Sequence, residues 1–318
     1  MSNNSDKSKA KLVTVDEGSE GQRLDNFLVK QLKGVPKSRV YRIIRKGEVR
    51  VNKGRAQASQ KLEIGDEVRI PPIRVSENEK KVSPSTYWGN VIAAATIRET
   101  PEYLFINKPS GLAVHGGSGQ SAGLIEQLRL SRPNERALEL VHRLDKDTSG
   151  VIVVAKKRSS LRRLQMAWQE GQVDKTYTAL VQGEYDGPSE IRLPLRKLVT
   201  QQGDRKTIVD HEDGKDSITE VKVVERLKGA TLIEAKLITG RMHQIRCHLA
   251  AVGYPIVADD KYGNFKRNGE FSKKYQISQL CLHASELAWP NAEWEVRAPL
   301  PAHFVKGLNQ LRKLSNLD

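Results

Sequence analysis

The chain has 318 residues, 38% of them hydrophobic, and a formal net charge of +15 at pH 7. No apolar run approaches the roughly 18 residues that a membrane-spanning helix needs, so the sequence excludes a helical membrane protein. The positive excess indicates a polyanionic partner. Nucleic acid fits that partner better than a membrane surface, because no stretch pairs a basic face with aromatic anchors.

The two cysteines, Cys247 and Cys281, are too few for a disulfide framework and suit a reducing compartment. Neither belongs to a Cys-x-x-Cys pair. His243 and His248 stand five residues apart, one more than the spacing of a helical ligand pair. The first nine residues lack the apolar core of a signal peptide. We therefore expect a cytoplasmic protein that binds no metal.

Residues 1–20 are polar and predict a disordered tail, and two helices are predicted after it. The second begins at Ser38, a candidate N-cap, and ends near Gly47. Two short alternating strands follow, around residues 49–51 and 68–70, with a turn at residues 52–54. The apolar residues that define the two helices at helical spacing are Leu24, Phe27, Leu28 and Leu32 in the first, and Val40, Ile43 and Ile44 in the second.

Residues 21–75 hold 14 Lys and Arg against 5 Asp and Glu, a net charge of +9 and more than half of the excess. An ordinary solvated helix face is the simpler explanation, but acidic partners at i, i+4 are nearly absent. The pattern therefore favours a surface that follows phosphates. Its candidate RNA-binding residues on the second predicted helix are Lys37, Arg39, Arg42, Arg45 and Lys46.

The run from Ser38 to Asn52, Ser-Arg-x-x-Arg-x-x-Arg-Lys-Gly-x-Val-x-Val-Asn, resembles the S4 RNA-binding domain, and the resemblance extends over about residues 22–72. We assign residues 21–75 to this domain. Pro71-Pro72 ends it, and the polar residues beyond predict a linker over residues 76–100, within which an apolar patch at residues 91–95 is ambiguous. Residues 101–318 predict one large mixed α/β domain.

Residues 103–107 predict a strand, and Lys108-Pro109-Ser110-Gly111 predicts a turn at its exit. The glycines at 116, 117 and 119 do not form a phosphate-binding motif, because they lack its spacing after a strand.

A short polar loop at residues 141–148 precedes residues 151–155, which predict a buried strand. The loop carries Asp145 two residues after Arg143. A carboxylate beside an arginine at the mouth of a buried strand would stay ionised and fixed, which suits a nucleophile or a base. The simpler alternative is that Asp145 and Asp147 only cap a turn.

Two further segments carry candidate residues. Residues 175–183 predict a strand that places Tyr177 on one face, where a tyrosine is most often part of the core. Residues 239–249 predict a helix capped by Thr239, with a buried stripe of Met242, Ile245, Leu249 and Val252. Arg246 lies off that stripe and, without further information, is a surface arginine of a basic protein.

Four motifs together resemble the ribosomal large-subunit pseudouridine synthases. They are His-Arg-Leu-Asp-x-Asp-Thr-Ser-Gly from His142, Lys-x-Tyr-x-Ala-Leu-Val-x-Gly from Lys175, Thr-Gly-Arg-x-His-Gln-Ile-Arg-x-His from Thr239, and Lys-Pro-x-Gly from Lys108. Cys247 replaces a residue that is usually β-branched there, a tolerable small apolar change. The resemblance extends over nearly the whole chain.

The resemblance implies roles for these residues. Asp145 is the catalytic carboxylate, Tyr177 stacks on the target base, and Arg246 pairs with Asp145 through a bidentate contact. Arg143 fills the space that the flipped uridine leaves. The Lys-Pro-x-Gly segment packs beneath the catalytic loop. His142 and Arg241 complete the expected substrate-binding residues.

The implied fold is α+β: a small S4-like RNA-binding domain, joined by a linker to a large mixed α/β catalytic domain with a mainly antiparallel sheet. The implied reaction isomerises uridine to pseudouridine in 23S ribosomal RNA or its assembly intermediate. No cofactor is required, because the uracil both leaves and attacks the ribose. No heptad or large apolar stripe indicates a dimer, so we expect a monomer.

Alternative functions remain at this point. A sister synthase would act on other ribosomal or transfer RNA uridines, and a non-enzymatic RNA-binding or ribosome-assembly protein would use the large domain as a platform. A His142–Asp145–Ser149 triad is disfavoured because all three lie in one loop without a nucleophile elbow. A glycosidase would need a second acid facing Asp145, and Asp147 is too close in sequence to serve.

Overall fold

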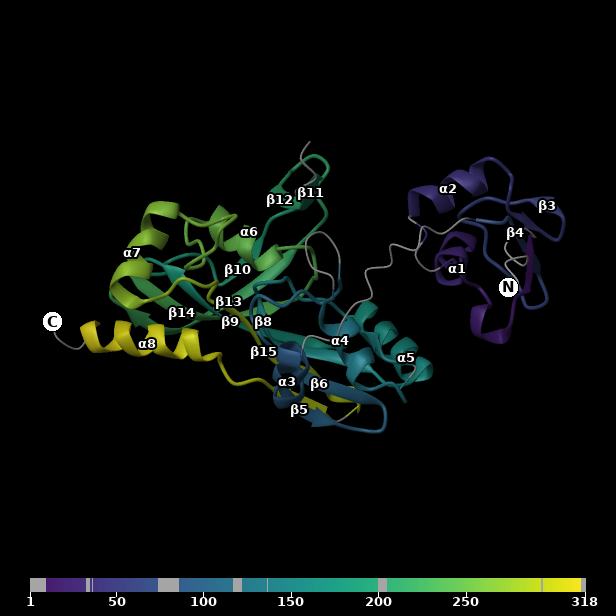
Figure 1. The fold of residues 1–318 in the computed structure, drawn as a ribbon. Helices are drawn as coiled ribbons and strands as arrows, with labels where there is room; N and C mark the ends of the chain where they lie inside the picture. Colours follow the sequence, from purple (N-terminus) through teal and green to yellow (C-terminus); the bar gives the residue numbers. More distant parts are fainter. Residues whose placement is uncertain are drawn as a thin grey trace, which may run out of the picture. The chain divides into compact units, whose positions relative to one another are not determined.

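The computed structural model describes residues 10–32, 35, 37–73, 86–116, 122–135, 137–199, 205–292 and 294–315. The chain divides into two compact units, Met1–Lys81 and Val82–Asp318. Figure 1 shows their elements, and each unit is taken by itself below.

The N-terminal unit packs two helices on a small antiparallel sheet. The helices are α1 (Leu24–Gln31) and α2 (Lys37–Arg45), and the strands are β1 (Lys11–Thr14), β2 (Arg50–Val51), β3 (Gly54–Arg55) and β4 (Glu67–Ile70), in the order β1-β4-β2-β3. A 3-10 turn, η1 (Glu17–Ser19), precedes α1. The predicted stripes of both helices lie together in one buried cluster. Gly47 ends α2 with a φ of 70°, as a C′ glycine does.

Two boundary predictions are wrong in part. Residues 11–14 of the predicted tail form β1, because β4 supplies the ladder hydrogen bonds that no local pattern reveals. Residues 86–94 and 96–99 of the predicted linker form α3 (Thr86–Ala94) and β5 (Thr96–Glu99). The ambiguous apolar patch ends α3, where Ile92 is buried against the large unit's core. Residues 1–9 and 74–85 lie outside the described part of the chain.

The large unit is built on a mixed, mainly antiparallel sheet, in which the pairing of β8 with β15 is parallel. Its path over the described residues is β10-β13-β14-β9-β15-β8-β6-β5, with β16 beside β15 and β7 beside β8. The strands are β6 (Tyr103–Lys108), β7 (Glu139–Leu140), β8 (Ser149–Ala155), β9 (Asp174–Gln182), β10 (Glu190–Arg192), β13 (Ile218–Leu227), β14 (Ala230–Leu237), β15 (Leu282–Trp289) and β16 (Trp294–Arg297). The expected α+β class is confirmed.

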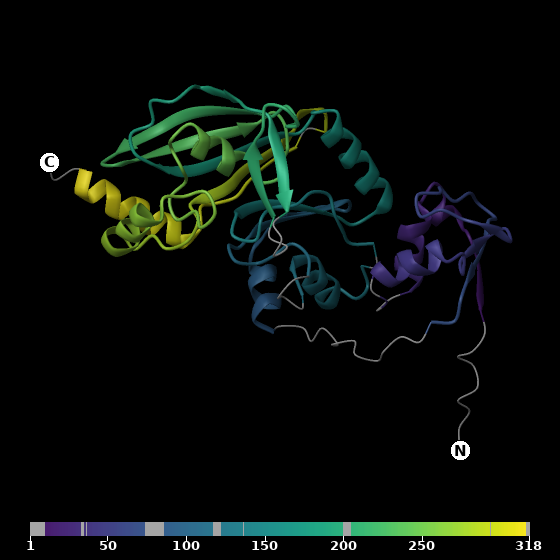
Figure 2. The same ribbon diagram turned by 90° about the horizontal axis from the view of Figure 1, so that it is seen from above.

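Helices cover the two halves of this sheet. In Figures 1 and 2, α4 (Leu124–Ser131) and α5 (Arg158–Gln169) lie beside the β6 and β8 half. The other half carries α6 (Gln244–Ala251), α7 (Phe265–Tyr275) and α8 (Ala302–Ser315). A separate hairpin joins β11 (Leu195–Val199) to β12 (Arg205–Val209), and a 3-10 turn, η2 (Pro290–Ala292), joins β15 to β16.

All seven residues of β8 are buried, since the strand is covered on both faces. Alternate side chains enter two different cores: Ile152 and Val154 join the cluster that includes α4, while Val151 and Val153 join the cluster that includes α5. The loop at residues 141–148 leads directly into this strand. The rigid strand therefore fixes one end of the loop that carries Asp145.

The segment after β6 holds the same loop from a second side. Lys108 is fully buried, and its Nζ donates to the carbonyl oxygens of Pro109, Leu112 and Lys146, each at 2.9 Å. Ser110 Oγ donates to the Asp147 carbonyl at 2.8 Å. Burial lowers the pKa of Lys108 to about 7, against the charges of Asp147 and Asp145. Lys108 thus has a structural role: it holds the loop through the Lys146 carbonyl.

Gly150→Ala is expected to destabilise the large unit by about 2 kcal/mol or more. Gly150 has a φ of +114°, and an added Cβ would lie 2.2 Å from the Ala284 carbonyl oxygen and 2.6 Å from its nitrogen. Urea unfolding followed by tryptophan fluorescence measures this unit alone, because all four tryptophans (88, 168, 289 and 294) lie within it.

Gly253→Ala is the matched control for Gly150→Ala. Gly253 also has a positive φ, +92°, but an added Cβ there would meet no atom within 4 Å. The Gly253→Ala variant therefore measures the destabilisation caused by an alanine at positive φ, without a steric clash of its Cβ. Equal losses of stability in the two variants would contradict a steric role for Gly150.

Candidate active site

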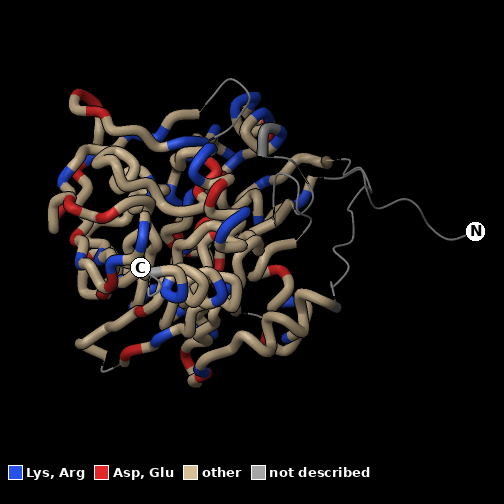
Figure 3. The backbone as a smooth tube through the Cα atoms, turned by 90° about the vertical axis from the view of Figure 1, so that its left-hand side faces the viewer, with Lys and Arg blue, Asp and Glu red and all other residues tan. Residues whose placement is uncertain are grey.

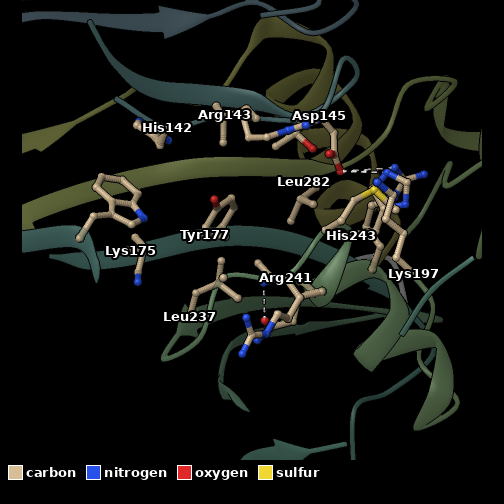
Figure 4. A pocket seen from close by; sticks show the side chains of 18 of the residues that line it. His142, Arg143, Asp145, Lys175, Tyr177, Lys197, Leu237, Arg241, His243 and Leu282 are labelled. Carbon is tan, nitrogen blue, oxygen red and sulfur yellow. Dashed lines mark hydrogen bonds and ion pairs between the residues drawn. The ribbon is translucent and has the colours of Figure 1, made fainter. Parts of the chain in front are cut away.

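The loop before β8, strand β9 and the start of α6 line one cavity of about 390 Å³ in the large unit (Figure 4). The structure brings the three predicted catalytic residues together there, and the predicted binding residues of this unit line the same cavity. Those six residues are Asp145, Tyr177, Arg246, His142, Arg143 and Arg241. Among the described lining residues, Asp145 is the single carboxylate.

Asp145 faces two potentially cationic side chains. Its Oδ2 lies 3.6 Å from Arg246 Nη1 and 3.6 Å from His243 Nε2, and its side chain keeps 20% of its exposure. These distances are within ion-pair range but longer than a hydrogen bond. One carboxylate oxygen is thus flanked by both groups, while the side chain stays open to the cavity (Figure 4).

Arg246 is held by a different carboxylate from the one expected. Its Nε donates to Asp259 Oδ2 at 2.7 Å and its Nη2 to Asp259 Oδ1 at 2.8 Å. Only Nη1 faces Asp145, so the expectation of a bidentate contact between Arg246 and Asp145 is wrong in this structure. The guanidinium has one such fork beside Nε, and the fully buried Asp259 occupies it.

The charge state of Arg246 follows from these contacts. Burial lowers its pKa, but the hydrogen bonds and charge of Asp259, with smaller effects from Asp145 and Asp260, raise it above the usual value. Arg246 is 3% exposed and is therefore not the surface arginine of the simpler explanation. Its charge is compensated inside the protein before any substrate arrives.

The start of α6 also differs from the prediction. Thr239 does not cap the helix, which begins at Gln244 after His243 adopts a left-handed conformation with φ 53°. Instead, the Gln244 side-chain oxygen accepts from the Thr239 hydroxyl and the Arg241 N–H, each at 2.9 Å. Ile245 and Leu249 of the predicted stripe are buried as expected.

His243 was not identified as a site residue from the sequence, where it was weighed only as a metal ligand. Its Nδ1 lies 2.9 Å from the hydroxyl of Tyr262, and its Nε2 faces Asp145. Burial lowers its pKa, although Asp145 opposes that effect. In the sequence, the one feature that could have identified His243 as a site residue was its place in the family motif Thr-Gly-Arg-x-His. No local pattern pointed to Asp259 or Tyr262.

Tyr177 lies on β9 and reaches the cavity half-buried. Burial, together with the charge of Asp145, raises the pKa of its phenol above the usual value. The phenol therefore stays protonated near neutral pH. It can donate a hydrogen bond or offer its ring face, but it is poorly suited to accept a proton.

His142 lines the cavity but is already engaged by the protein. Its ring stacks on Trp168 with a centroid distance of 4.4 Å, and its Nε2 accepts the Val153 N–H at 3.1 Å. Accepting at Nε2 requires a neutral ring with the proton on Nδ1. The contact ties the start of the loop to β8.

His142→Gln is expected to flatten the dependence of the large unit's stability on pH. Burial lowers the pKa of His142 from 6.5 to about 3, so between these values the unfolded chain binds a proton that the folded chain does not. The wild type therefore loses stability as the pH falls below about 6.5. His142 contributes at most about 1.4 kcal/mol to this loss per pH unit.

Urea unfolding at about pH 7.5 and 5.5, followed by tryptophan fluorescence, measures this difference. His142→Gln should lose less stability between the two conditions than the wild type, whatever its absolute stability. The same loss in both proteins would contradict a lowered pKa of His142 in the folded protein.

The remaining predicted residues are basic and more exposed. Arg143 and Arg241 are exposed at the cavity, where they are joined by Lys197 of the β11–β12 hairpin, which the sequence did not indicate. Figure 3 shows Lys and Arg positions, in blue, spread over much of the backbone. On α2 and just after it, Arg42, Arg45 and Lys46 are exposed and Arg39 is half-buried. The side chain of Lys37 lies outside the described part.

Within the described ranges, no cluster of three or more His, Cys, Asp or Glu residues is arranged to hold a metal ion. Over the same residues, no helix is both long and apolar enough to cross a membrane.

Comparisons with known proteins agree with the two-unit arrangement. The family model for RNA pseudouridylate synthase matches residues 102–251, and the S4 domain model matches residues 22–68. The chain is 25% identical to the solved structure of human RNA Pseudouridylate Synthase Domain Containing 4, with a TM-score of 0.60, covering 71% of this chain and 96% of that one.

Two curated relatives are similar over nearly the full length. Ribosomal large subunit pseudouridine synthase C of Escherichia coli (strain K12) is 47% identical over 309 residues, which are 95% of this chain and 97% of that protein. The protein of the same name from Vibrio parahaemolyticus is 46% identical over 315 residues, 96% of this chain and 98% of that protein. This chain therefore belongs to the family of RNA pseudouridine synthases, isomerases of RNA uridine, in the group that carries an S4 domain.

Proposed function

We propose that this protein isomerises specific uridines of 23S ribosomal RNA to pseudouridine, on the free RNA or on an assembly intermediate of the large subunit. The relatives named above act, by their names, on the large ribosomal subunit. The observation that carries the proposal is the cavity in which one carboxylate, Asp145, stands between Arg246 and His243. The protein would act as a cytoplasmic monomer.

Asp145 is the proposed catalytic carboxylate. The reaction breaks the N1–C1′ bond of uridine, turns the uracil and joins C5 to C1′, after which C5 loses a proton and N1 gains one. A nucleophile or base is needed, and Tyr177 is poorly suited to that role because its phenol stays protonated. We assign the role to Asp145, the one carboxylate among the described lining residues, which attacks the ribose C1′ or the uracil C6, or takes a proton.

The other lining residues support this chemistry. Tyr177 offers its ring to the uracil by stacking, which holds the detached base where it can attack again. The target nucleotide must first leave its stack, at a cost of about a few kcal/mol. Arg143 is exposed beside Asp145 and would fill the space that the nucleotide leaves. Arg241 and Lys197 would contact phosphates at the cavity mouth.

Pseudouridine mapping of ribosomal and transfer RNA, in cells with and without the gene, tests the proposal. Specific sites in 23S RNA should disappear and return with the wild-type gene but not with Asp145→Asn. Loss of transfer RNA sites instead would identify a sister synthase. An unchanged map, together with no turnover on 23S RNA in vitro, would indicate a binding protein.

The N-terminal unit is proposed to supply phosphate contacts. Replacing Arg42, Arg45 and Lys46 together by Gln should weaken RNA binding and reduce the slope of log K against log salt by about 2 to 3, since each lost phosphate contact removes about 0.7 to 0.9. Fluorescence anisotropy at several salt concentrations measures this. Turnover at saturating RNA should stay near the wild-type rate.

The matched control removes the same charge from another surface. Lys266, Lys273 and Lys274 on α7 are exposed, and replacing them by Gln also lowers the net charge by three. An equal change of salt slope in both triple variants would mean that only net charge matters. The role given to the S4 domain would then be refuted.

A further inference from the structure

A short turn at residues 259–262 touches both groups that flank Asp145. It lies between α6 and α7, outside the segments that carry Asp145, Tyr177 and Arg246. Asp259 binds Arg246, and Tyr262 contacts both Arg246 and His243. None of its side chains lines the cavity, so the turn acts on the site only through these two neighbours.

Asp259 is a fixed anchor. Its side chain is fully buried, and its Oδ1 accepts the N–H groups of Lys261 and Tyr262, each at 2.9 Å. Its carbonyl accepts the Asn268 side-chain amide at 2.9 Å. The preceding residue, Ala258, has a left-handed φ of 60°, a conformation that the surrounding contacts must maintain.

The segment before the turn is tied to the strand that carries Tyr177. Val257 N–H donates to the Leu180 carbonyl and Gln182 N–H donates to the Pro255 carbonyl, each at 2.9 Å. Asp259, which binds Arg246, therefore follows a segment that is hydrogen-bonded to β9. The loop of Asp145 is instead held by β8 and Lys108. Because Asp259 binds Arg246, the position of Arg246 relative to Asp145 depends on Asp259.

Tyr262 provides a second contact for each flanking group. Its ring lies beneath the Arg246 guanidinium, 5.3 Å from centroid to Cζ, which is within cation–π range. Its hydroxyl accepts the Thr207 N–H at 2.8 Å and lies 2.9 Å from His243 Nδ1. One side chain thus limits the orientation of both the guanidinium and the imidazole.

We propose that the Asp259–Tyr262 turn is the positioning element of the active site: Asp259 aims Arg246 Nη1, and Tyr262 aims His243 Nε2, at Asp145 Oδ2. The inference rests on the proposed function, because the consequence for turnover assumes that Asp145 performs the chemistry. Asp259 and Tyr262 are positioning residues, since neither lines the cavity.

Asp259→Asn tests the first half of the inference with little other change. The amide oxygen can still accept the two N–H groups of the turn at the Oδ1 position, but the NH2 group that replaces Oδ2 cannot accept from Arg246 Nε. We expect kcat to fall by about 10- to 100-fold, as for a small misplacement of a catalytic group, while KM and RNA affinity stay within about twofold.

Asp260→Asn is the matched control. Asp260 also contacts Arg246 Nη2, at 3.0 Å, but its side chain is 69% exposed, so solvent screens the contact. Its effect on kcat should be far smaller than that of Asp259→Asn. Equal effects of the two variants would overturn the special role of the buried carboxylate.

A double variant separates positioning from general weakening of the structure. If Asp259 acts through Arg246, adding Asp259→Asn to Arg246→Lys should lower kcat by less than about threefold further. Multiplying losses would overturn the inference. If Asp259→Asn fails to fold, Tyr262→Phe tests the second half. It removes one hydroxyl and should lower kcat about fivefold, with no further loss in a His243→Gln background.

A measurement that does not depend on turnover distinguishes the two proposals. The Arg246 Nε–H signal in NMR, identified by its loss in Arg246→Lys, should exchange slowly in the wild type and much faster in Asp259→Asn. If the wild type does not isomerise uridine, the proposed function fails, and faster exchange still establishes that Asp259 holds Arg246. Unchanged exchange, or unchanged kcat in an active enzyme, would overturn the inference.

Discussion

Asp145→Asn is expected to lower turnover by at least about 10³-fold while RNA affinity stays within about twofold. Among the described residues that line the cavity, Asp145 is the one carboxylate, Tyr177 stays protonated, and Arg246 is held by Asp259. Asparagine keeps the shape but removes the charge. Single-turnover assays on 23S RNA fragments and anisotropy on the same RNA measure the two quantities separately.

Asp147→Asn is the control within the same loop. It removes an identical charge two residues away, from a side chain that does not line the cavity. Its backbone carbonyl, which Ser110 binds, is unaffected. Turnover should remain within a few-fold of the wild type. A loss comparable to that of Asp145→Asn would mean that the loop needs its overall charge rather than one catalytic carboxylate.

Arg246→Lys is expected to lower turnover by about 10²-fold although the positive charge is kept. Arg246 uses Nε and Nη2 for Asp259 while Nη1 faces Asp145 on the other side. An ammonium on a flexible chain cannot hold both carboxylates in one geometry. We expect it to pair with the buried Asp259 and leave Asp145 without its guanidinium neighbour. Single-turnover rates measure the effect.

Arg241→Lys makes the same replacement at an exposed arginine of the same cavity. Within the described part of the chain, the Arg241 guanidinium makes one long contact, from Nη2 to the Asp216 carbonyl at 3.4 Å. The substitution should change RNA affinity by a few-fold and leave the rate at saturation nearly intact. If Arg246→Lys turned over at the wild-type rate, a positive charge alone would be sufficient. Catalysis would then not require Arg246 to contact Asp259 and Asp145 at the same time.

The site combines groups from several places in the chain. Asp145 is held by β8 and by Lys108 from below, Tyr177 by β9, and Arg246 by the turn at residues 259–262. Within these supports Lys108 and Asp259 are fully buried and hydrogen-bonded. Asp145 itself stays 20% exposed, and its two charged neighbours among the described residues lie 3.6 Å away, an arrangement that suits the proposed reaction with a bound nucleotide.

Local pattern was enough for much of the N-terminal unit and for the loop that carries Asp145. The apolar spacing of α1 and α2, the glycine that ends α2 and the alternation in β4 are all local, so they could be read without the fold. Asp145 could be named as a candidate because its loop, its arginine and the buried strand after it are consecutive, but turn capping was the simpler explanation until the family motifs were considered. The family motifs then added Tyr177 and Arg246, which physical pattern alone would have assigned to the core and the surface.

The sequence by itself therefore determined the class of the protein, its polyanionic partner and the carboxylate at its centre, because composition and contiguous motifs carry that information. The tertiary structure alone decided which carboxylate occupies the Arg246 fork, since Asp259 reaches it across 13 residues and a change of chain direction. It also decided that β1, α3 and β5 are ordered: β4, distant in sequence, completes the hydrogen bonds of β1, the neighbouring β6 pairs with β5, and Ile92 of α3 is buried in a core shared with α4 and β8. Contacts of this kind depend on where the chain returns in space, and no periodicity within a segment records that.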